Sequence, residues 1–177
     1  MIIVGDNLRS LAEQFAIVDD PARVEESCIG LTLDDRIIEV QPPTGEVVRY
    51  GRKIPADWVH SSVIGDAGLV LSPGDAVLGC SAEKIVMPLG YLGFIQTKGS
   101  LARHFVTIHC SDGQVDPGFS GQVTFEICNL GNYPVMLRSG DRVALLFIHK
   151  ASTVCAPYDG VYQSADGPTI PLPRSRH

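Results

Sequence analysis

Apolar residues recur along the chain in two different spacings, which predict one helix and then a series of strands. Near the start, Leu8, Leu11, Ala12 and Phe15 fall on one face at helical spacing, and Asp6 stands where a helix cap is expected. We therefore predict a helix over residues 6–16. From residue 29 onward, short apolar runs are separated by turns rich in Gly, Pro and Asp, as in β proteins. The predicted strands cover residues 29–33, 36–40, 47–50, 69–71, 76–81, 84–87, 122–128 and 142–149.

This pattern predicts a mostly β protein with one short N-terminal helix, built as a sandwich, a jelly roll or a distorted barrel. Residues 143–148 are apolar on both alternating faces, so their strand should be central. The 177 residues fit one domain over 1–177, because no linker or low-complexity tract divides them. Residues from about 157 to 177 contain Gly, Pro, Ser and Arg without periodicity, which predicts a mobile tail.

Charge and cysteine usage narrow the class of protein. The net charge is −6 and no basic run is present, which argues against nonspecific nucleic-acid binding. The sequence has neither a signal peptide nor an apolar run long enough to span a bilayer. The cysteines are odd in number and far apart, so we expect reduced thiols in a cytoplasmic protein. They are Cys28, Cys80, Cys110, Cys128 and Cys155.

A glutamate stands in the middle of the predicted strand 122–128. Val123, Phe125 and Ile127 alternate onto one face, which is the expected core face. Glu126 then lies on the opposite, polar face. Alone it would be interpreted as a solvated carboxylate, but other candidate site residues lie nearby in the sequence.

Two neighbouring segments could bind a ligand. Lys98, Ser100 and Arg103 supply two cations and a hydroxyl around a flexible turn. This combination can bind a phosphate chain, but an ordinary loop explains it equally well. Asp116 lies in a tight turn, where an Asp bonds either its own backbone or a sugar hydroxyl. None of the five His pairs with Cys or Glu at metal-ligand spacing, and the zinc-deaminase pattern is absent. A Ser-His-Asp triad stays open, although no nucleophile elbow supports it.

At these residues the sequence resembles the dCTP deaminase family, which shares its fold with trimeric dUTPases. The resemblance begins at Met1-Ile-Ile and the helix after it, and it continues through most of the chain. Its central and C-terminal motifs are Ser100-Leu-Ala-Arg103, Val115-Asp-Pro-Gly-Phe-x-Gly121, Glu126, Asn129-Leu-Gly131 and Tyr158-x-Gly-x-Tyr-Gln163.

The resemblance implies a hydrolase that deaminates the cytosine of dCTP to give dUTP and ammonia without zinc. It implies a homotrimer of distorted barrel or jelly-roll subunits with sites between them. Glu126 would be the catalytic proton carrier and Arg103 the arginine beside it. The substrate-binding positions would be Lys98, Ser100, Asp112, Val115, Asp116, Tyr158 and Gln163, with Mg²⁺ held through the triphosphate rather than by the protein.

Several positions depart from the family pattern, and they bear on substrate choice. Gly99 replaces a Ser that helps to position the attacking water, and Asp112 stands where a small residue is usual. In the tail, Val161 replaces a phosphate-binding Lys and Ala165 replaces a Gln that reads the base. Two alternatives therefore stay open. One is a dUTPase-type pyrophosphatase or a bifunctional deaminase and diphosphatase, and the other is a non-catalytic nucleotide-binding module.

Overall fold

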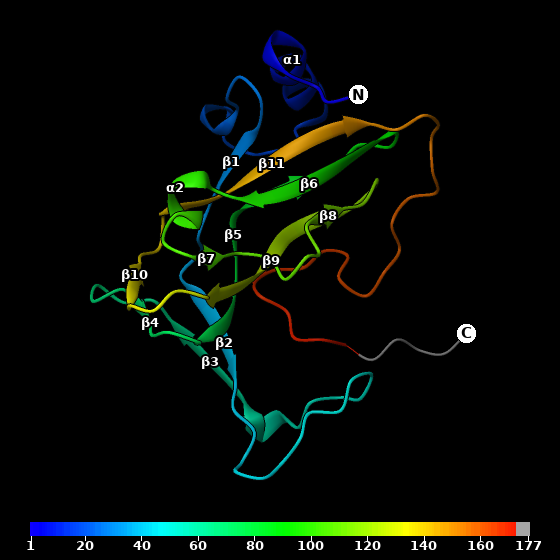
Figure 1. Ribbon diagram of the computed structural model, residues 1–177. Helices are drawn as coiled ribbons and strands as arrows, with labels where there is room; N and C mark the ends of the chain where they lie inside the picture. Colours follow the sequence, from blue (N-terminus) through cyan, green and yellow to red (C-terminus); the bar gives the residue numbers. More distant parts are fainter. Residues whose placement is uncertain (173–177) are drawn as a thin grey trace.

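The computed structural model describes residues 1–172, and most of their regular structure is strand (Figure 1). In chain order the elements are α1 (Gly5–Phe15), η1 (Pro21–Arg23), β1 (Ile29–Thr32), β2 (Arg36–Val40), η2 (Ala56–Trp58), β3 (Val59–Val63), β4 (Leu69–Leu71), β5 (Ala76–Val86), β6 (Tyr91–Thr97), α2 (Gly99–Ala102), β7 (Val106–Thr107), β8 (Gln114–Val115), β9 (Ser120–Asn129), β10 (Val135–Leu137) and β11 (Arg142–Lys150).

The strands form two larger sheets and one small ribbon. One sheet has the order β1-β11-β6-β8, the other has the order β3-β2-β5-β9-β7, and β10 pairs with β4. The mostly β class with one short N-terminal helix is confirmed. Among residues 1–172 the sheets stay open rather than joining into one closed barrel. The prediction that residues 143–148 form a central strand is also confirmed, because β11 pairs with β1 on one side and β6 on the other.

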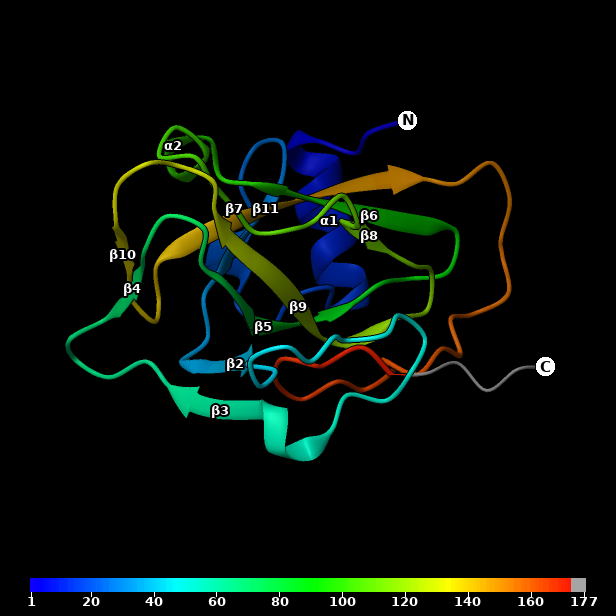
Figure 2. The same cartoon turned by 60° about the horizontal axis from the view of Figure 1, so that its bottom comes forward.

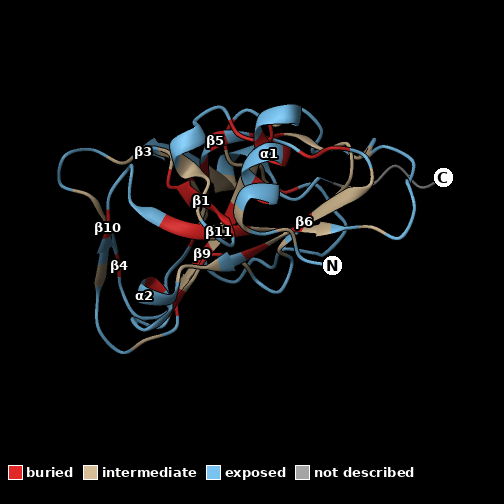
Figure 3. Ribbon diagram, turned by 90° about the horizontal axis from the view of Figure 1, so that it is seen from above, coloured by how far each residue is buried: buried red, intermediate tan, exposed pale blue. Residues whose placement is uncertain are grey.

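The core receives side chains from both larger sheets. Leu146 and Ile148 of β11 and Phe125 and Ile127 of β9 are fully buried in one cluster. In Figure 3 the buried segments run along β11 and β9 through the middle of the molecule. Fully burying one such side chain stabilises the fold by about 1.5–3 kcal/mol. This core fixes β9 in place, and β9 carries Glu126.

The predicted N-terminal helix is confirmed within one residue at each end. Leu8, Leu11 and Ala12 are its buried face and join the core cluster. The helix ends at Ala16, which adopts a left-handed conformation and whose N–H bonds back to the last turn. Phe15 lies at the edge of this face and is 40% exposed.

Residues 76–87 differ from the sequence prediction of two strands. β5 is one strand, and its register with β9 shifts between Cys80 and Lys84. The irregularity turns Glu83 inward, where it is 4% exposed and accepts hydrogen bonds from the N–H and the hydroxyl of Thr32, at 2.9 and 2.7 Å. Arg23 Nε lies 3.0 Å from the same carboxylate as an ion pair, without the alignment of a hydrogen bond.

The sequence prediction of strands was wrong at one segment and missed several others. Residues 47–50 contain no strand, because nothing covers them: Val47 is 81% exposed and Tyr50 is fully exposed. Conversely, β3, β6, β7, β8 and β10 were not expected. Only pairing with β2 identifies β3, since four of its five residues are exposed.

Within residues 1–172, no helix has both the length and the apolar character needed to cross a membrane.

Candidate active site

Glu126 lies in the middle of β9, as the alternating pattern predicted. It is opposite Leu78 of β5, and its neighbours Phe125 and Ile127 point into the core. The carboxylate is half-buried and accepts one hydrogen bond from the backbone N–H of Cys110, at 3.2 Å to Oε2. A rigid strand and one loop amide therefore hold this carboxylate.

The surroundings of Glu126 raise the pKa of its carboxyl group. Burial is the largest cause, the N–H of Cys110 opposes it, and the negative charge of Asp112 raises the pKa further. His109 opposes the rise through its charge. A carboxyl group with a raised pKa exchanges a proton near neutral pH more readily than an ordinary glutamate does, which is the property a general acid–base needs.

The loop before β9 holds the other acidic candidates. Asp112 is exposed, and its charge acts on Glu126. Asp116 is half-buried and accepts a hydrogen bond from the side-chain amide of Gln114. Val115 is only 3% exposed and belongs to the core cluster, so its side chain is not available to a ligand.

Arg103 does not contact Glu126 within this chain. Its guanidinium donates to the carbonyl of Gly99 at 2.9 Å, which folds it back over α2. Residues 1–172 contain no ion pair or hydrogen bond between Arg103 and Glu126. Within these residues, Arg103 and Glu126 therefore have no direct pairing.

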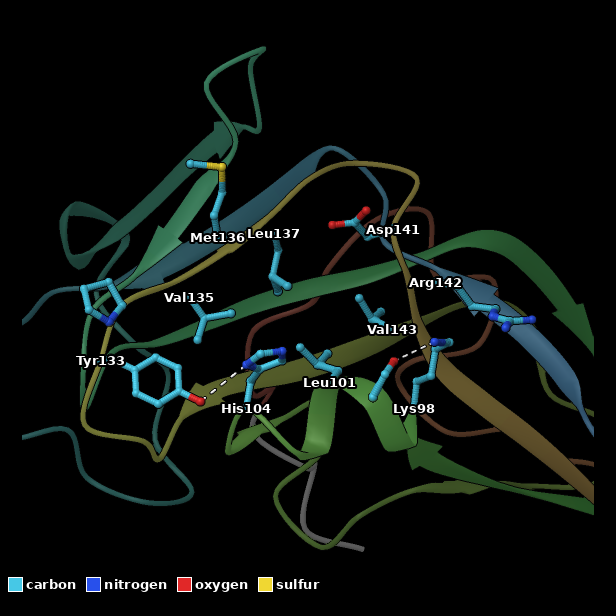
Figure 4. Close-up of a pocket in the computed structure, with 12 residues that line it drawn as sticks. Lys98, Leu101, His104, Tyr133, Val135, Met136, Leu137, Asp141, Arg142 and Val143 are labelled. Atoms are coloured by element: carbon cyan, nitrogen blue, oxygen red, sulfur yellow. Dashed lines mark hydrogen bonds between the residues drawn. The ribbon is translucent and has the colours of Figure 1, made fainter.

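Lys98 and Ser100 line an open groove of about 710 Å³ beside α2 (Figure 4). The Lys98 ammonium donates to the Ser100 hydroxyl at 2.6 Å. Across the groove, His104 and Tyr133 approach to 3.3 Å, a contact that sequence reasoning missed because 29 residues separate them. Glu126 does not line this groove. The cationic groove and the carboxylate are thus two separate places on one subunit.

The C-terminal segment docks on the start of β9, which differs from the expectation of a mobile tail (Figure 2). Ser164 N–H donates to Ser120 O at 2.7 Å, and Gln122 N–H donates to Ala165 O at 2.8 Å. Thr169 closes the contact through its backbone N–H, which donates to the Thr124 hydroxyl at 3.1 Å. Residues 157–172 are therefore folded against the sheet. The remainder of the predicted tail, residues 173–177, lies outside the described residues.

Two glycines make this docking possible. Gly118 has φ +82° and Gly121 has φ +156°, which L side chains rarely adopt. A Cβ at Gly118 would lie 2.8 Å from Pro157, and one at Gly121 would lie 2.8 Å from the backbone of Ala165. The Pro-Gly-Phe-Ser-Gly turn is shaped to receive the tail.

The two tail residues singled out from the sequence have different surroundings. Gln163 is engaged with the protein itself, since its side-chain oxygen accepts from Ser120 N–H at 2.9 Å and its amide donates to Gly118 O at 2.9 Å. Tyr158 packs edge to face on Phe119, with ring centroids 5.9 Å apart. Gln163 thus links the tail to the turn before β9 through two hydrogen bonds.

Metal ligands do not gather in the described part of the chain. Residues 1–172 hold no group of three or more His, Cys, Asp or Glu side chains placed to bind one ion. The prediction that the protein itself holds no metal stays a prediction.

Known proteins similar to this chain include several dCTP deaminases. A dCTP deaminase from Halorubrum lacusprofundi is 35% identical over 176 residues, covering 93% of this chain and 86% of the relative. A protein named "dCTP deaminase, dUMP-forming" from Coprothermobacter proteolyticus is 29% identical, covering 95% of this chain and 94% of the relative. The crystal structure of 2′-deoxycytidine 5′-triphosphate deaminase from Agrobacterium tumefaciens superposes with a TM-score of 0.65 at 16% identity, covering 85% of this chain and 48% of that chain.

The superposition shows a shared fold, although this chain spans about half the length of the Agrobacterium protein. The relatives, which cover most of this chain, show that it is an enzyme, a hydrolase of the deaminase class. The family model for dCTP deaminase-like proteins matches residues 2–151. The chain belongs to the dCTP deaminase-like family.

Proposed function

We propose that this enzyme hydrolyses the exocyclic amine of dCTP, giving dUTP and ammonia without zinc. The observation that carries the proposal is Glu126, a half-buried carboxylate on a rigid strand whose pKa is raised by burial and by Asp112. The dCTP deaminase names of its relatives support the choice of substrate.

In the proposed mechanism, ionised Glu126 takes a proton from a water molecule as its oxygen attacks the amine-bearing carbon of the cytosine ring. The carboxylic acid gives this proton to the ring nitrogen. Glu126 next carries the remaining proton of the added hydroxyl to the amine, the C–N bond breaks, the C=O bond forms and ammonia leaves. The raised pKa suits both halves of this cycle, since the group must accept a proton and release it again. The N–H of Cys110 orients the carboxylate during both transfers.

Lys98 and Ser100 are proposed to bind the phosphates, with Mg²⁺ entering on the triphosphate and taking no protein ligand. Their position in an open groove supports this role, because a cation and a hydroxyl there are accessible to an anionic ligand. Asp116 is proposed to accept a hydrogen bond from the deoxyribose 3′-hydroxyl, with the backbone of Val115 beside it.

The complete site is proposed to form between subunits of a homotrimer. Arg103 and Glu126 do not meet within residues 1–172, so a site containing both needs a second chain. The tail is proposed to close over the nucleotide, with Tyr158 covering it and Gln163 fixing the turn at Gly118. The free thiols of all five cysteines support a cytoplasmic location.

A dUMP-forming activity is the second candidate. It is favoured by relatives that carry this name, including a Halobacterium salinarum protein 32% identical over 157 residues. In that case the same site would also release pyrophosphate. The half-buried Asp116 is the residue proposed to activate the water that attacks phosphorus.

The deciding experiment incubates the purified enzyme with dCTP and Mg²⁺ and measures ammonia, pyrophosphate and the nucleotide product together. Ammonia with dUTP supports the simple deaminase, and ammonia with dUMP and pyrophosphate supports the dUMP-forming enzyme. Pyrophosphate from dUTP without ammonia from any cytosine nucleotide would indicate a dUTPase. Calorimetric binding of dCTP, dCDP, dCMP and dUTP without turnover would instead indicate a non-catalytic nucleotide-binding module.

A further inference from the structure

Two cysteine thiols lie beside the carboxylate of Glu126. The sulfur atoms of Cys110 and Cys128 are 3.8 Å apart. Cys128 follows Glu126 by two residues on β9 and so stands on the same face of the strand. Cys110 supplies the backbone N–H that donates to Glu126. The same two residues form a thiol pair and flank the carboxylate.

We propose that Cys110 and Cys128 form a redox switch, in which oxidation links them in a disulfide and lowers deaminase activity, and reduction restores it. The inhibitory half of this inference rests on the proposed function of Glu126. The disulfide itself does not depend on that function.

The positions of the five cysteines single out this pair. Cys28 and Cys80 are 4% and 0% exposed, so oxidants do not reach them readily. Cys155 is exposed, and the only polar contact of its thiol within residues 1–172 is the Thr153 carbonyl. Cys110 is exposed and has a second thiol within reach. Only Cys110 therefore combines access to an oxidant with a partner.

Cys128 is suited to the second step rather than the first. Burial raises its pKa to about 11, with a further contribution from Cys110, so its thiol stays protonated at neutral pH. The first oxidation therefore falls on Cys110, and Cys128 is the resolving thiol.

Hydrogen peroxide is the proposed class of oxidant, and the reaction balances as follows. The Cys110 thiolate attacks one peroxide oxygen, the O–O bond breaks and hydroxide leaves, which gives a sulfenic acid. The Cys128 sulfur then attacks the Cys110 sulfur, the S–S bond forms and the S–O bond breaks. The departing hydroxide takes the Cys128 proton. Two thiols are oxidised, and one peroxide is reduced to two waters.

Linking the sulfurs moves a group that Glu126 depends on. A disulfide brings its sulfur atoms to about 2.05 Å, whereas these lie 3.8 Å apart. Cys110 sits on the loop between β7 and β8, so the loop is the more movable side of the pair. Moving Cys110 also moves its backbone N–H. That N–H orients the Glu126 carboxylate and, by its hydrogen bond, lowers the pKa of Glu126.

The test treats the full-length enzyme, first reduced and then freed of reductant, with increasing hydrogen peroxide. Intact mass and peptide mapping follow the link, and ammonia release from dCTP follows activity. We expect each chain to lose two hydrogens, a linked peptide pair to contain Cys110 and Cys128, and the rate to fall about tenfold or more. Dithiothreitol should reverse all three changes.

Matched variants separate this pair from general oxidation. Cys128→Ala should abolish the linked peptide pair, whereas Cys155→Ala should keep both the link and the reversible loss of rate. Each variant is compared with its own reduced form, so a change in basal activity does not affect the result. A non-reducing gel identifies disulfides between chains.

Two results would overturn the inference. One is a fully oxidised chain in which Cys110 and Cys128 remain unlinked, and the other is a linked enzyme that keeps its reduced rate. A reduced enzyme that releases no ammonia from dCTP would overturn the proposed function, and the inhibitory half of the switch with it. The mass measurement would still decide whether the link forms.

Discussion

Glu83 and Glu126 are glutamates on strands that pair with each other, but their side chains differ in burial, hydrogen bonds and ion pairing. Glu83 of β5 is buried, accepts two hydrogen bonds from Thr32 and forms an ion pair with Arg23. Glu126 of β9 is half-buried and accepts one hydrogen bond, from the N–H of Cys110. Two charged neighbours act on its pKa: Asp112 raises it, and His109 lowers it by less.

The difference separates a structural carboxylate from a reactive one. A buried carboxylate that is fully hydrogen-bonded and ion-paired has a structural role, because removing one of its partners destabilises the fold. A carboxylate with fewer donors and a raised pKa changes its protonation state cheaply, which suits proton transfer. Substitutions at and around these two glutamates test the contrast.

Replacing Glu126 with Gln should lower kcat for ammonia release by about 10²–10⁴-fold, the usual contribution of a general acid–base. Gln keeps the size of the side chain and an oxygen that accepts from Cys110. Steady-state kinetics on dCTP measure the effect. A variant that keeps its rate would remove Glu126 from the mechanism.

The same substitution should raise the melting temperature at neutral pH. The pKa of Glu126 is raised in the folded state, so ionising it costs stability at pH values above that pKa. Gln removes this cost. The gain over the parent enzyme should therefore shrink as the pH falls through the raised pKa, where the parent becomes protonated. Thermal unfolding at several pH values measures it, and a lower melting temperature at neutral pH would contradict the argument.

Replacing Glu83 with Ala should reduce the free energy of unfolding by about 3 kcal/mol, near the lower end for breaking a buried ion pair. The lower end applies because Arg23 is 35% exposed and regains water when its partner is lost. Urea unfolding measures the change. Glu46→Ala, on an exposed loop, is the matched control and should stay within about 0.5 kcal/mol of the parent.

Replacing Thr32 with Val should cost about 1–2 kcal/mol, because one hydrogen bond to a buried charge is lost while the Thr32 N–H remains. Urea unfolding again provides the value. If the Glu83 cluster acts as one unit, the Thr32→Val and Glu83→Ala costs should not add. Full additivity would show that the hydroxyl stabilises the fold independently of Glu83.

Replacing Asp112 with Asn should move the acidic limb of the kcat/KM profile toward lower pH. The charge of Asp112 raises the pKa of Glu126, so removing it lets the carboxylate persist to a lower pH. The shift should be the smallest effect of the series, since Asp112 is exposed and screened by solvent. A shift toward higher pH would contradict the assigned interaction.

The contrast between the two glutamates also shows how far sequence reasoning reaches. The position of Glu126 in mid-strand was predicted correctly, because the alternation of apolar residues at Phe125 and Ile127 is a local signal. The burial of Glu83 was not predictable in this way. In the sequence, residues 82 and 83 form a gap between two predicted strands, and only pairing with β9 reveals the irregularity that turns Glu83 inward.

The candidate site was predictable in its residues but not in its assembly. The segment at Lys98–Arg103 and the strand at Glu126 were both identified, yet one chain does not bring Arg103 to Glu126. The docked tail was missed for a related reason. Its partners Ser120, Gln122 and Thr124 lie more than 40 residues upstream, where no local pattern records them.

The docked tail also has a consequence for how this enzyme can diversify. Its contacts occupy alternate positions of β9 at Ser120, Gln122 and Thr124, and Glu126 is the next position on that face. Residues 157–172 add no side chain to the main core cluster. Substitutions in this segment can therefore accumulate without disturbing the core packing that holds β9 and its Glu126 in place.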